Sequence, residues 1–417
     1  MRFFSRKYIF SYLYKLLCKK QIAASYSLSW EQRKVVDLLI ERNQQAPMSD
    51  EYPLMAFIAN EGVAPKGERY DRSALVTDTV NKLYKKTEKG DFIYSSNNLE
   101  TGSIGLNKYG KACISPVYSI FEPTGIADSD FLGRRLVRKD FINAMVKWRQ
   151  GVIYGQWRIH ESDFLKIEIT VPSVEEQRKI GAYLDQLDNL ITLHQRKFEK
   201  LTNVKKSMLE KMFPQNGSSY PEIRFKGFTD PWEQRKVSDL AEKTYGGGTP
   251  TTSNEAYWNG DIPWIQSSDV VDGKLLGVEP RKWITQDGLN NSAAQLIPGN
   301  SIAIITRVGV GKLAFMPYSY ATSQDFLSLS KLNAEPLFTV YACYKKLQSE
   351  LNAVQGTSIK GITKDELLAK NIMVPRYAEQ QQIGAFFKQL DNLITLHQRE
   401  LEKLQNIKKS MLEKMFV

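Results

Sequence analysis

The sequence predicts a mixed α/β (α+β) protein in which two domains alternate with two long helices, and three observations support this fold class. Residues 176–213 and 379–416 align without a gap and share 29 identities in 38 positions. The hexapeptide WEQRKV occurs at 30–35 and again at 232–237. The residues between these landmarks differ in sequence but keep one order of strand and helix signals. The chain is therefore an internal repeat with similar ends and divergent middles.

The composition is that of a globular protein with a basic surface. A chain of 417 residues has room for two or three domains, and its 42% hydrophobic and 25% charged residues are ordinary for a folded protein. The 57 Lys and Arg against 46 Asp and Glu give a net charge of +11. Such a surplus attracts nucleic acid, acidic membranes or acidic proteins, and charge alone does not choose among them.

The cysteines and the N-terminal residues give information on the cellular location of the protein. Three scattered cysteines argue against a disulfide framework and against a cysteine zinc site, so a reducing, cytoplasmic setting is expected. No apolar run approaches the roughly 20 residues that span a bilayer. Residues 1–28 combine basic ends with a short apolar centre, which is typical of a signal peptide or a basic amphipathic helix. Because Lys15 interrupts that centre, we favour an atypical N-terminal extension.

The divergent middles each contain strands, an amphipathic helix, a loop marked by glycine and a final strand ending in Val-Pro. In the first half these signals fall at 90–96, 138–151 and 165–172, and in the second at 298–308, 325–332, 337–356 and 369–375. Proline shortly before the repeated segment suits the entry to a helix.

The repeated segment predicts a helix of about 35–40 residues, roughly 50–60 Å long at 1.5 Å per residue. Apolar residues recur every seven positions in both copies, as in a coiled coil. The predicted packing residues are Ile180, Leu184, Leu187, Ile191, His194 and Leu201 in the first copy, and Ile383, Leu390, Ile394, His397 and Leu404 in the second. The twin helix is the nearest partner for this stripe. The stripe is wide enough either to leave apolar surface for another protein or to be buried entirely within the chain.

His194 and His397 interrupt the apolar row of the two helices. A lone polar residue in a helical seam sets the register or the partner, and this is the favoured interpretation. Metal ligation is the disfavoured alternative, because no cysteine, second histidine or patterned carboxylate stands at ligand spacing.

Catalytic motifs are missing from the sequence. Gly246–Gly248 is followed by Thr-Pro rather than by a helix start, and the segment 308–314 lacks the glycine spacing and the Ser or Thr of a phosphate loop. The absence of known catalytic motifs from the sequence favours a binding protein over an enzyme with an unfamiliar site.

Three features together resemble the specificity (S) subunit of type I restriction–modification enzymes: the stretch GGGTPTTSNEAYWNGDIPWIQSSDV at 246–270, the tandem WEQRKV openings and the paired long segments. The resemblance implies a non-catalytic chain whose two target-recognition domains each read half of a bipartite double-stranded DNA site. It also implies that the helices pair antiparallel as a spacer and dock two methyltransferase (modification) subunits, which restriction subunits join. S-adenosylmethionine, ATP and Mg²⁺ would then belong to the partner subunits, with no cofactor in this chain.

The resemblance divides the chain into six parts. They are an extension at 1–28, target-recognition domain 1 at 29–173, helical spacer 1 at 174–214, a linker at 215–230, target-recognition domain 2 at 231–376 and helical spacer 2 at 377–417. The first half departs from the family pattern, since it lacks the lead-in YPEIRFKGFTD that precedes the second opening. Divergent domains imply an asymmetric split site, with half-sites about one helical turn, roughly 34 Å, apart.

Residues that read or hold DNA are expected on loops and helix ends, because direct readout needs Arg, Lys, Asn, Gln, Ser or Thr that can enter a groove. The candidates in the first half are Tyr154, Gln156 and Arg158 for bases and Lys108, Lys111, Arg134 and Arg135 for phosphates. In the second half they are Thr249, Thr251, Thr252, Ser267, Ser268, Arg307, Thr357, Ser358 and Lys360. The alternative function is a basic coiled-coil scaffold that binds only protein.

Overall fold

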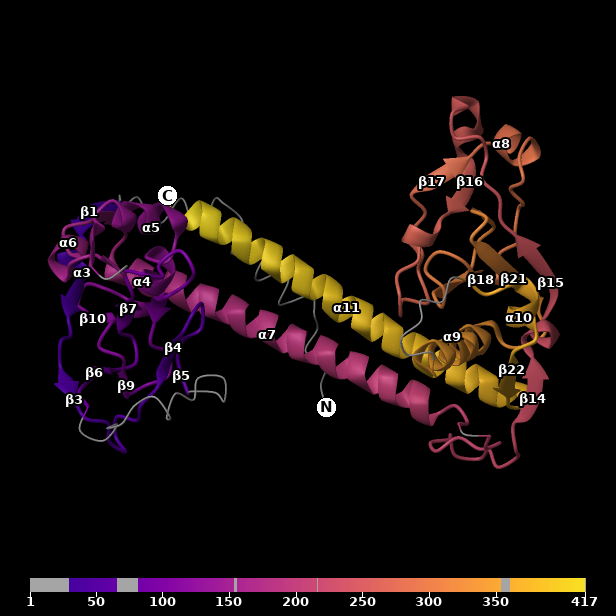
Figure 1. Ribbon diagram of the computed structural model, residues 1–417, viewed down its shortest axis with the longest axis horizontal. Helices are drawn as coiled ribbons and strands as arrows, with labels where there is room; N and C mark the ends of the chain where they lie inside the picture. The colour runs from indigo at the N-terminus through magenta and orange to yellow at the C-terminus, as the bar shows by residue number, and fades with distance from the viewer. Residues whose placement is uncertain (1–29, 66–81, 154–155, 216, 354–360, 417) are drawn as a thin grey trace. The chain divides into compact units, whose positions relative to one another are not determined.

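The computed structural model describes residues 30–65, 82–153, 156–215, 217–353 and 361–416 (Figure 1). The extension at 1–28 and the candidates Tyr154, Thr357, Ser358 and Lys360 lie outside the described residues.

The chain forms two compact units that share its two long helices. Unit 1 comprises residues 1–190 and 405–417, and unit 2 comprises residues 191–404. The long helices are α7 (Val174–Lys211) and α11 (Tyr377–Met415). Each unit therefore combines one globular domain, the beginning of the helix that follows it and the end of the other helix. The predicted fold class, α/β domains alternating with two long helices, is confirmed.

Unit 1 contains small antiparallel sheets packed with short helices. Its four-stranded sheet runs in the order β2 (Leu39–Glu41), β10 (Ser119–Pro123), β7 (Phe92–Tyr94) and β8 (Ile104–Leu106), and a three-stranded sheet runs β3 (Gln45–Ala46), β6 (Tyr84–Thr87) and β9 (Ala112–Ile114). Two strand pairs are β4 (Ala56–Ile58) with β5 (Gly62–Ala64) and β11 (Gln150–Ile153) with β12 (Gln156–Arg158). The helices are α3 (Val35–Leu38), α4 (Ser129–Arg135), α5 (Lys139–Val146) and α6 (Glu161–Phe164).

Unit 2 repeats the order of the four-stranded sheet with longer strands, and its three-stranded sheet contains a parallel pair (Figure 1). Its four-stranded sheet runs β15 (Ala241–Gly246), β21 (Phe326–Leu332), β18 (Ser301–Ile305) and β19 (Leu313–Met316), and a three-stranded sheet runs β17 (Lys282–Ile284), β16 (Trp258–Ile265) and β20 (Ala321–Thr322). The helices are α8 (Gln286–Asn290), α9 (Pro336–Ala353) and α10 (Lys364–Leu368), with single 3-10 turns at Val237–Leu240, Glu255–Tyr257 and Ser267–Asp269.

The repeated openings pair with the strands that close each half. In unit 1, β1 (Glu31–Lys34) runs antiparallel to β13 (Glu168–Val171), and Glu31 stands opposite Val171. In unit 2, β14 (Glu233–Lys236) pairs in the same register with β22 (Asn371–Val374). The repeated opening of each half is therefore hydrogen-bonded to the strand that leads into its long helix.

A buried glutamine fixes the start of each long helix. Gln177 donates its side-chain amide to the carbonyl of Pro172 at 2.9 Å, and Gln380 donates to Pro375 at 2.8 Å. The side-chain oxygen of each glutamine also accepts a backbone N–H from the globular domain of its own unit. Both glutamines are almost fully buried, so these bonds anchor each helix to its domain.

Within unit 2, α7 and α11 lie antiparallel. The Lys205 ammonium is 2.6 Å from the Asp391 carboxylate, and the Nδ1 atoms of His194 and His397 lie 3.1 Å apart. As residue numbers fall along α7, those of its contacts on α11 rise. The two histidines lie in the seam, as their position on the apolar row predicts, and there they contact each other.

In unit 1 the end of α11 lies beside the beginning of α7, where Lys408 forms a 2.5 Å ion pair with Asp188. This pair is the repeat equivalent of the pair between Lys205 and Asp391. Most predicted packing residues are buried or half-buried. Ile180, Leu184, Leu187, Ile383, Leu390 and Leu404 are buried, and Ile191, Leu201 and Ile394 are half-buried.

An aromatic cluster holds the end of α7 in unit 2. Phe213, two residues after the helix, is buried against Trp232, Phe338 and Phe387, with ring centroids 5.8–6.0 Å away. Trp232 opens the second WEQRKV segment. The globular domain of unit 2 thereby packs against the end of α7, a helix that begins in the first half of the sequence.

Unit 1 holds the end of α11 with equivalent residues. The Phe416 ring lies 5.2 Å from that of Phe131 and 6.5 Å from that of Trp30, which opens the first WEQRKV segment. The Arg138 guanidinium stacks 5.6 Å from the Phe416 ring and donates to the carbonyl of Leu412.

The lead-in found only in the second half packs on the start of α11. Arg224 makes two hydrogen bonds, of 2.8 and 2.7 Å, to the carboxylate of Glu379, which is 1% exposed. Phe225 packs edge-on against Phe386 at 6.0 Å. The equivalent glutamate in unit 1, Glu176, is half-buried. The lead-in is thus a structural part of unit 2.

Candidate nucleic-acid interface

Several strands of unit 2 end at one place in the four-stranded sheet and its neighbour (Figure 1). The last residue of β18, Ile305, pairs with the first residue of β21, Phe326. The end of β16 runs parallel to β20, with Ile265 opposite Thr322. Because β15 also ends beside the start of β21, the segments that follow all these strands meet. We call residues 247–249, 266–268, 306–307 and 323–325 the polar edge of unit 2.

Backbone hydrogen bonds join the segments of the polar edge. The N–H of Gly248 donates to Thr322 at 2.8 Å, and the N–H of Ser323 donates to Ile265 at 2.9 Å. The N–H of Thr306 donates to the carbonyl of Asp325 at 2.8 Å. These bonds fix the backbone, so the side chains of the polar edge project from a rigid frame.

Glycines allow this close approach. A β-carbon at Gly247 would lie 1.8 Å from the carbonyl oxygen of Ser323, and one at Gly248 would lie 2.2 Å from the carbonyl carbon of Ala293. The Trp264 indole donates to the carbonyl of Gly248 at 3.0 Å. The GGTP and IPWI sequences are therefore the scaffold of the polar edge, since a side chain at either glycine would force the segments apart.

The polar edge brings together four of the predicted DNA-contacting residues. Thr249, Ser267, Ser268 and Arg307 lie in it, and the last two are exposed. Thr251 and Thr252 follow in an exposed turn whose Thr251 carbonyl accepts the indole N–H of Trp258 at 3.2 Å. Although Thr357, Ser358 and Lys360 lie outside the described residues, Ile362 donates its N–H to Thr306 at 2.8 Å, so the described chain after them returns to this edge.

Sequence reasoning missed two glutamines there. Gln324 is exposed, and its side-chain oxygen accepts a 2.6 Å hydrogen bond from the hydroxyl of Thr249. The Gln266 side chain donates to the hydroxyl of Ser268 at 2.9 Å. Gln266 stands directly before the predicted Ser267 and was open to sequence reasoning. Nothing local distinguishes Gln324, because its neighbour Thr249 is 75 residues away in the chain.

Basic side chains lie on the neighbouring strand β17 and the turn before it. Arg281 is 67% exposed, and the Lys282 ammonium lies 5.5 Å from the ring centre of Trp258. Exposed cations of this kind suit phosphate contacts, which position a duplex without reading it.

Unit 1 has an edge at the equivalent place. Ile159 donates its N–H to the hydroxyl of Ser96, two residues after β7, at 3.0 Å. This sets Arg158 and Trp157 beside the end of that strand. Arg158 is 65% exposed and 4.0 Å from Glu161, and Trp157 is also exposed. The predicted Gln156 begins β12.

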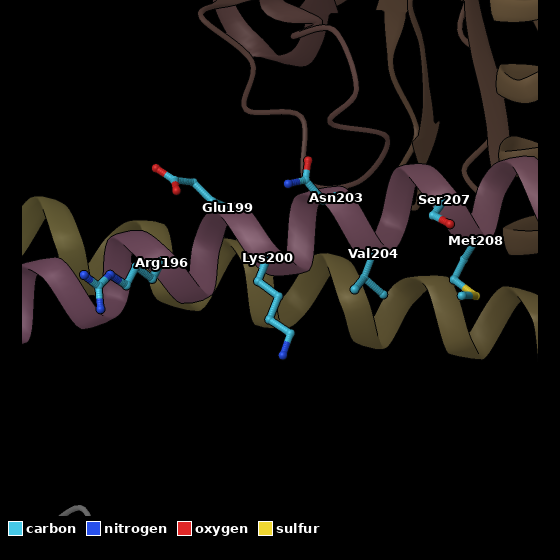
Figure 2. A pocket seen from close by; sticks show the side chains of 7 residues that line it. All are labelled: Arg196, Glu199, Lys200, Asn203, Val204, Ser207 and Met208. Carbon is cyan, nitrogen blue, oxygen red and sulfur yellow. The ribbon is translucent and has the colours of Figure 1, made fainter. Parts of the chain in front are cut away.

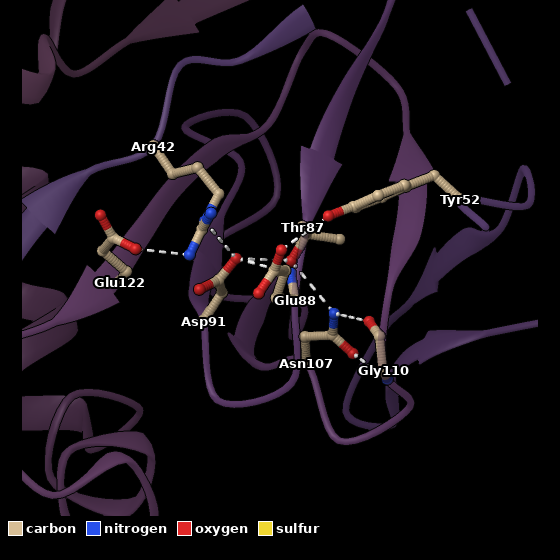
Figure 3. A network of polar contacts seen from close by, with 8 residues as sticks. All are labelled: Arg42, Tyr52, Thr87, Glu88, Asp91, Asn107, Gly110 and Glu122. Carbon is tan, nitrogen blue, oxygen red and sulfur yellow. Dashed lines mark hydrogen bonds and ion pairs between the residues drawn. The ribbon is translucent and has the colours of Figure 1, made fainter. Parts of the chain in front are cut away.

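Lys108 and Lys111 sit at the opposite end of β7, on a loop held by Asn107. The Asn107 side chain donates to the carbonyl of Gly110 at 2.7 Å and to the hydroxyl of Thr87 at 3.1 Å (Figure 3). Both lysines are exposed, and Lys111 forms an ion pair with Glu51. The structure therefore does not bring these lysines together with Arg158.

Asp91 anchors the network behind that loop (Figure 3). Its buried carboxylate accepts the N–H of Glu88 at 2.8 Å and the hydroxyl of Thr87 at 3.1 Å, and lies 3.0 Å from Nε of Arg42. Burial nevertheless raises the pKa of Asp91 above its ordinary value, despite these partners. The network stabilises the loop and presents no exposed reactive group.

Arg134 and Arg135 lie in the interior of unit 1. The Arg134 guanidinium makes ion pairs with Asp185 at 2.6 Å and Asp188 at 2.8 Å, and its side chain is 11% exposed. Arg135 pairs with Asp140 at 2.9 Å and is 10% exposed. These arginines join α4 to α7 and to α5. Their charges are paired and withdrawn from solvent, so the geometry gives no support to the predicted phosphate contacts.

The paired helices keep apolar residues at the surface of unit 2. Leu193 is 45% exposed and Leu393 is 44% exposed. A pocket on α7 is lined by Arg196, Glu199, Lys200, Asn203, Val204, Ser207 and Met208. Figure 2 shows Lys200, Val204 and Met208 pointing to one side of the helix, with Glu199 and Asn203 on the other. Apolar atoms framed by charges suit a protein partner.

The described residues form neither a metal site nor a membrane-spanning helix. In the residues that the structure describes, no group of three or more His, Cys, Asp or Glu side chains is placed to hold a metal ion. No helix in the described part of the chain has both the length and the apolar character needed to cross a membrane.

The chain repeats one globular domain and one long helix, and it gathers polar side chains at one edge of a sheet. These features define the class of protein, which is a duplicated binding protein. Residues 27–203 and 229–406 both match the family described as the type I restriction modification DNA specificity domain. These segments cover most of the chain, which therefore belongs to that family. This assignment supports the DNA-specificity interpretation over the protein-only scaffold.

Individual relatives support the same family assignment. The chain is 28% identical over 193 residues to the type I restriction enzyme MjaIX specificity subunit of Methanocaldococcus jannaschii, an alignment that covers 45% of this chain and 44% of that relative. It thus spans less than half of that relative's length. The MjaVIII specificity subunit of the same organism is 23% identical over 408 residues, covering 92% of this chain and 91% of its own length.

A solved structure shares the fold. The S subunit of the type I restriction–modification system from M. genitalium aligns with a TM-score of 0.58 at 12% identity, covering 94% of this chain and 97% of that chain.

Proposed function

We propose that this protein is a non-catalytic DNA-specificity subunit in which each globular domain reads one half of an asymmetric, bipartite double-stranded DNA site. The observation that carries the proposal is the contrast within the repeat. The openings, closing strands and helix anchors are equivalent in the two units, whereas the side chains at the two sheet edges differ. A common frame with divergent edges is what two different half-sites require.

The chemistry of the edges supports this proposal. The polar edge of unit 2 presents Gln, Ser, Thr and Arg, the residue types that contact base edges and phosphates. The net charge of +11 favours a polyanionic ligand. The 38- and 39-residue helices, each about 57 Å long at 1.5 Å per residue, are long enough to act as a spacer for half-sites one turn of DNA apart.

The same proposal extends to partners. Two methyltransferase (modification) subunits would dock on the helices, because a repeated helix surface suits two copies of one partner, and restriction subunits would join that core. S-adenosylmethionine, ATP and Mg²⁺ would be held by these partners in the cytoplasm. Exposed Leu193 on α7 and exposed Leu393 on α11, which are not equivalent positions of the repeat, supply apolar docking surface.

Methylation mapping tests the DNA assignment. The chain produced with its methyltransferase should direct methylation to one split sequence. Exchange of residues 231–376 for the equivalent domain of a relative should change one half of that sequence and leave the other half unchanged. Methylation at a contiguous site, or changes in both halves after the exchange, would contradict the proposal.

Substitution of the exposed leucines tests docking. Leu193→Glu and Leu393→Glu should strongly reduce co-purification of the methyltransferase without lowering the melting temperature, because these side chains are exposed in the free chain. Glu242→Gln, an exposed change on strand β15 in the globular domain of the same unit, is the control. Buried Leu187 and Leu390 are unsuitable probes, because a charge there would disrupt the helix pair itself. Full retention of the methyltransferase by both leucine variants would place its docking surface elsewhere.

A further inference from the structure

Gln324 stands at the centre of the polar edge on a backbone that is held from three sides. Ser323 before it donates its N–H to Ile265, and Asp325 after it accepts the N–H of Thr306 at 2.8 Å and its hydroxyl at 3.1 Å. The backbone of Gly247 packs so closely against Ser323 that a β-carbon at position 247 would not fit between them. The backbone of this turn is therefore held in one conformation, and Gln324 is exposed at the tip of the turn.

The Gln324 side chain is itself oriented. The Thr249 hydroxyl donates to its Oε1 at 2.6 Å, so one lone pair of that oxygen is used and the amide NH₂ points away from Thr249. A hydrogen bond between exposed side chains contributes little to stability. Its effect is to present the amide in one orientation, which lowers the entropy that Gln324 loses on meeting a ligand.

An amide held in this way matches one base in particular. Adenine offers N7 as an acceptor and N6 as a donor side by side in the major groove, and a glutamine satisfies both with its NH₂ and its oxygen. The second lone pair of Oε1 is available for N6. Arg307, exposed one residue after Thr306, supplies a positive charge at the same edge.

The equivalent turn of unit 1 differs in chemistry. The turn before β10 spans Ser115–Tyr118 and is closed by a 3.3 Å bond from the N–H of Tyr118 to Ser115. The corresponding bond in unit 2 joins Phe326 to Ser323 at 3.4 Å. Counted from these two bonds, the residue of unit 1 that matches Gln324 is Pro116, which is exposed and is followed by exposed Val117, so unit 1 has no amide where unit 2 exposes a glutamine. The same frame thus carries a different chemical group in each domain.

We propose that Gln324 is a specificity-determining residue that recognises the adenine of one A·T pair in the half-site read by unit 2, with Thr249 as its positioning residue. This inference rests on the proposed function and adds the base and the residue that reads it.

The test uses the full chain assembled with its methyltransferase, and DNA duplexes in which each base pair of the mapped site is changed in turn. Gln324→Ala should lower discrimination at one A·T pair of one half-site by roughly 5- to 150-fold, the range for loss of a bidentate base contact. Thr249→Val should produce a smaller loss at the same pair. Gln324→Glu should favour a C·G pair there, because a carboxylate accepts from the cytosine amino group.

Gln286→Ala is the matched control, since Gln286 is an exposed glutamine of the same unit bonded to Asn290 at 2.9 Å. It should leave every position unchanged, and all variants should keep the parental melting temperature. If Gln324→Ala affects all positions equally, or none, while the parent remains specific, Gln324 does not read a base. In that case this inference fails and the proposed function stands. If the parent complex itself shows no sequence preference, the proposed function fails.

Discussion

Replacing Arg224 by alanine is expected to destabilise unit 2 by about 3–5 kcal/mol, the cost of leaving a buried charge without its partner. Glu379 is 1% exposed, and both of its carboxylate oxygens accept hydrogen bonds from the Arg224 guanidinium. The alanine variant removes both bonds and leaves the carboxylate in the interior. Urea unfolding followed by tryptophan fluorescence measures the loss.

Two further variants separate the buried charge from general damage. Arg376→Ala breaks the exposed 2.9 Å ion pair with Asp230 and should cost under about 1 kcal/mol. Glu379→Gln added to Arg224→Ala should recover part of the loss, because the amide carries no charge to desolvate. Equal stability of the Arg224 and Arg376 single variants would refute the role assigned to this pair.

Phe213→Ala is expected to cost a similar amount, about 3–5 kcal/mol, because it empties an aromatic site in the core. Phe213 is 5% exposed and contacts Trp232, Phe338 and Phe387. Since this phenylalanine belongs to the segment that follows α7, its loss should also release the end of that helix from unit 2. Thermal unfolding measures the stability, and hydrogen exchange along residues 200–213 measures the release of the helix end.

Tyr377→Ala is the control for this second prediction, because Tyr377 begins α11 and is 54% exposed. Its effect should stay within about 0.5 kcal/mol. Phe416→Ala, the repeat equivalent, should act on unit 1 through Phe131 and Trp30. If hydrogen exchange along the α7 end were unchanged in Phe213→Ala, the aromatic cluster would not be what holds it.

Much of the fold follows from patterns that are local in sequence. The seven-residue spacing predicts the helices, because side chains seven apart lie on one face whatever the rest of the chain does. The short strand-like runs at 90–96, 298–308 and 325–332 predict β7, β18 and β21, because brief apolar runs beside turn residues are typical of strands. The position of His194 and His397 on the apolar row predicts that they lie in the seam, and the structure adds that they contact each other.

The candidate site follows from sequence only in part. Thr249, Ser267, Ser268 and Arg307 were predicted one by one from residue type and loop position, and they lie together. Arg134 and Arg135 show the limit of that method. An arginine on a helix looks the same in sequence whether it faces a phosphate or, as Arg134 does, pairs with carboxylates 51 and 54 residues away.

The sequence by itself determined the duplication, the two long helices and the equivalence of the two halves, because repeats and periodicity are properties of neighbouring residues. Only the tertiary structure decided which segments meet. Gln324 lies beside Thr249 because β15 ends beside the start of β21, with Gly246 opposite Leu327, and the N–H of Gly248 after it donates to the carbonyl of Thr322. Strand register depends on the packing of the whole sheet, and no short stretch of sequence specifies it.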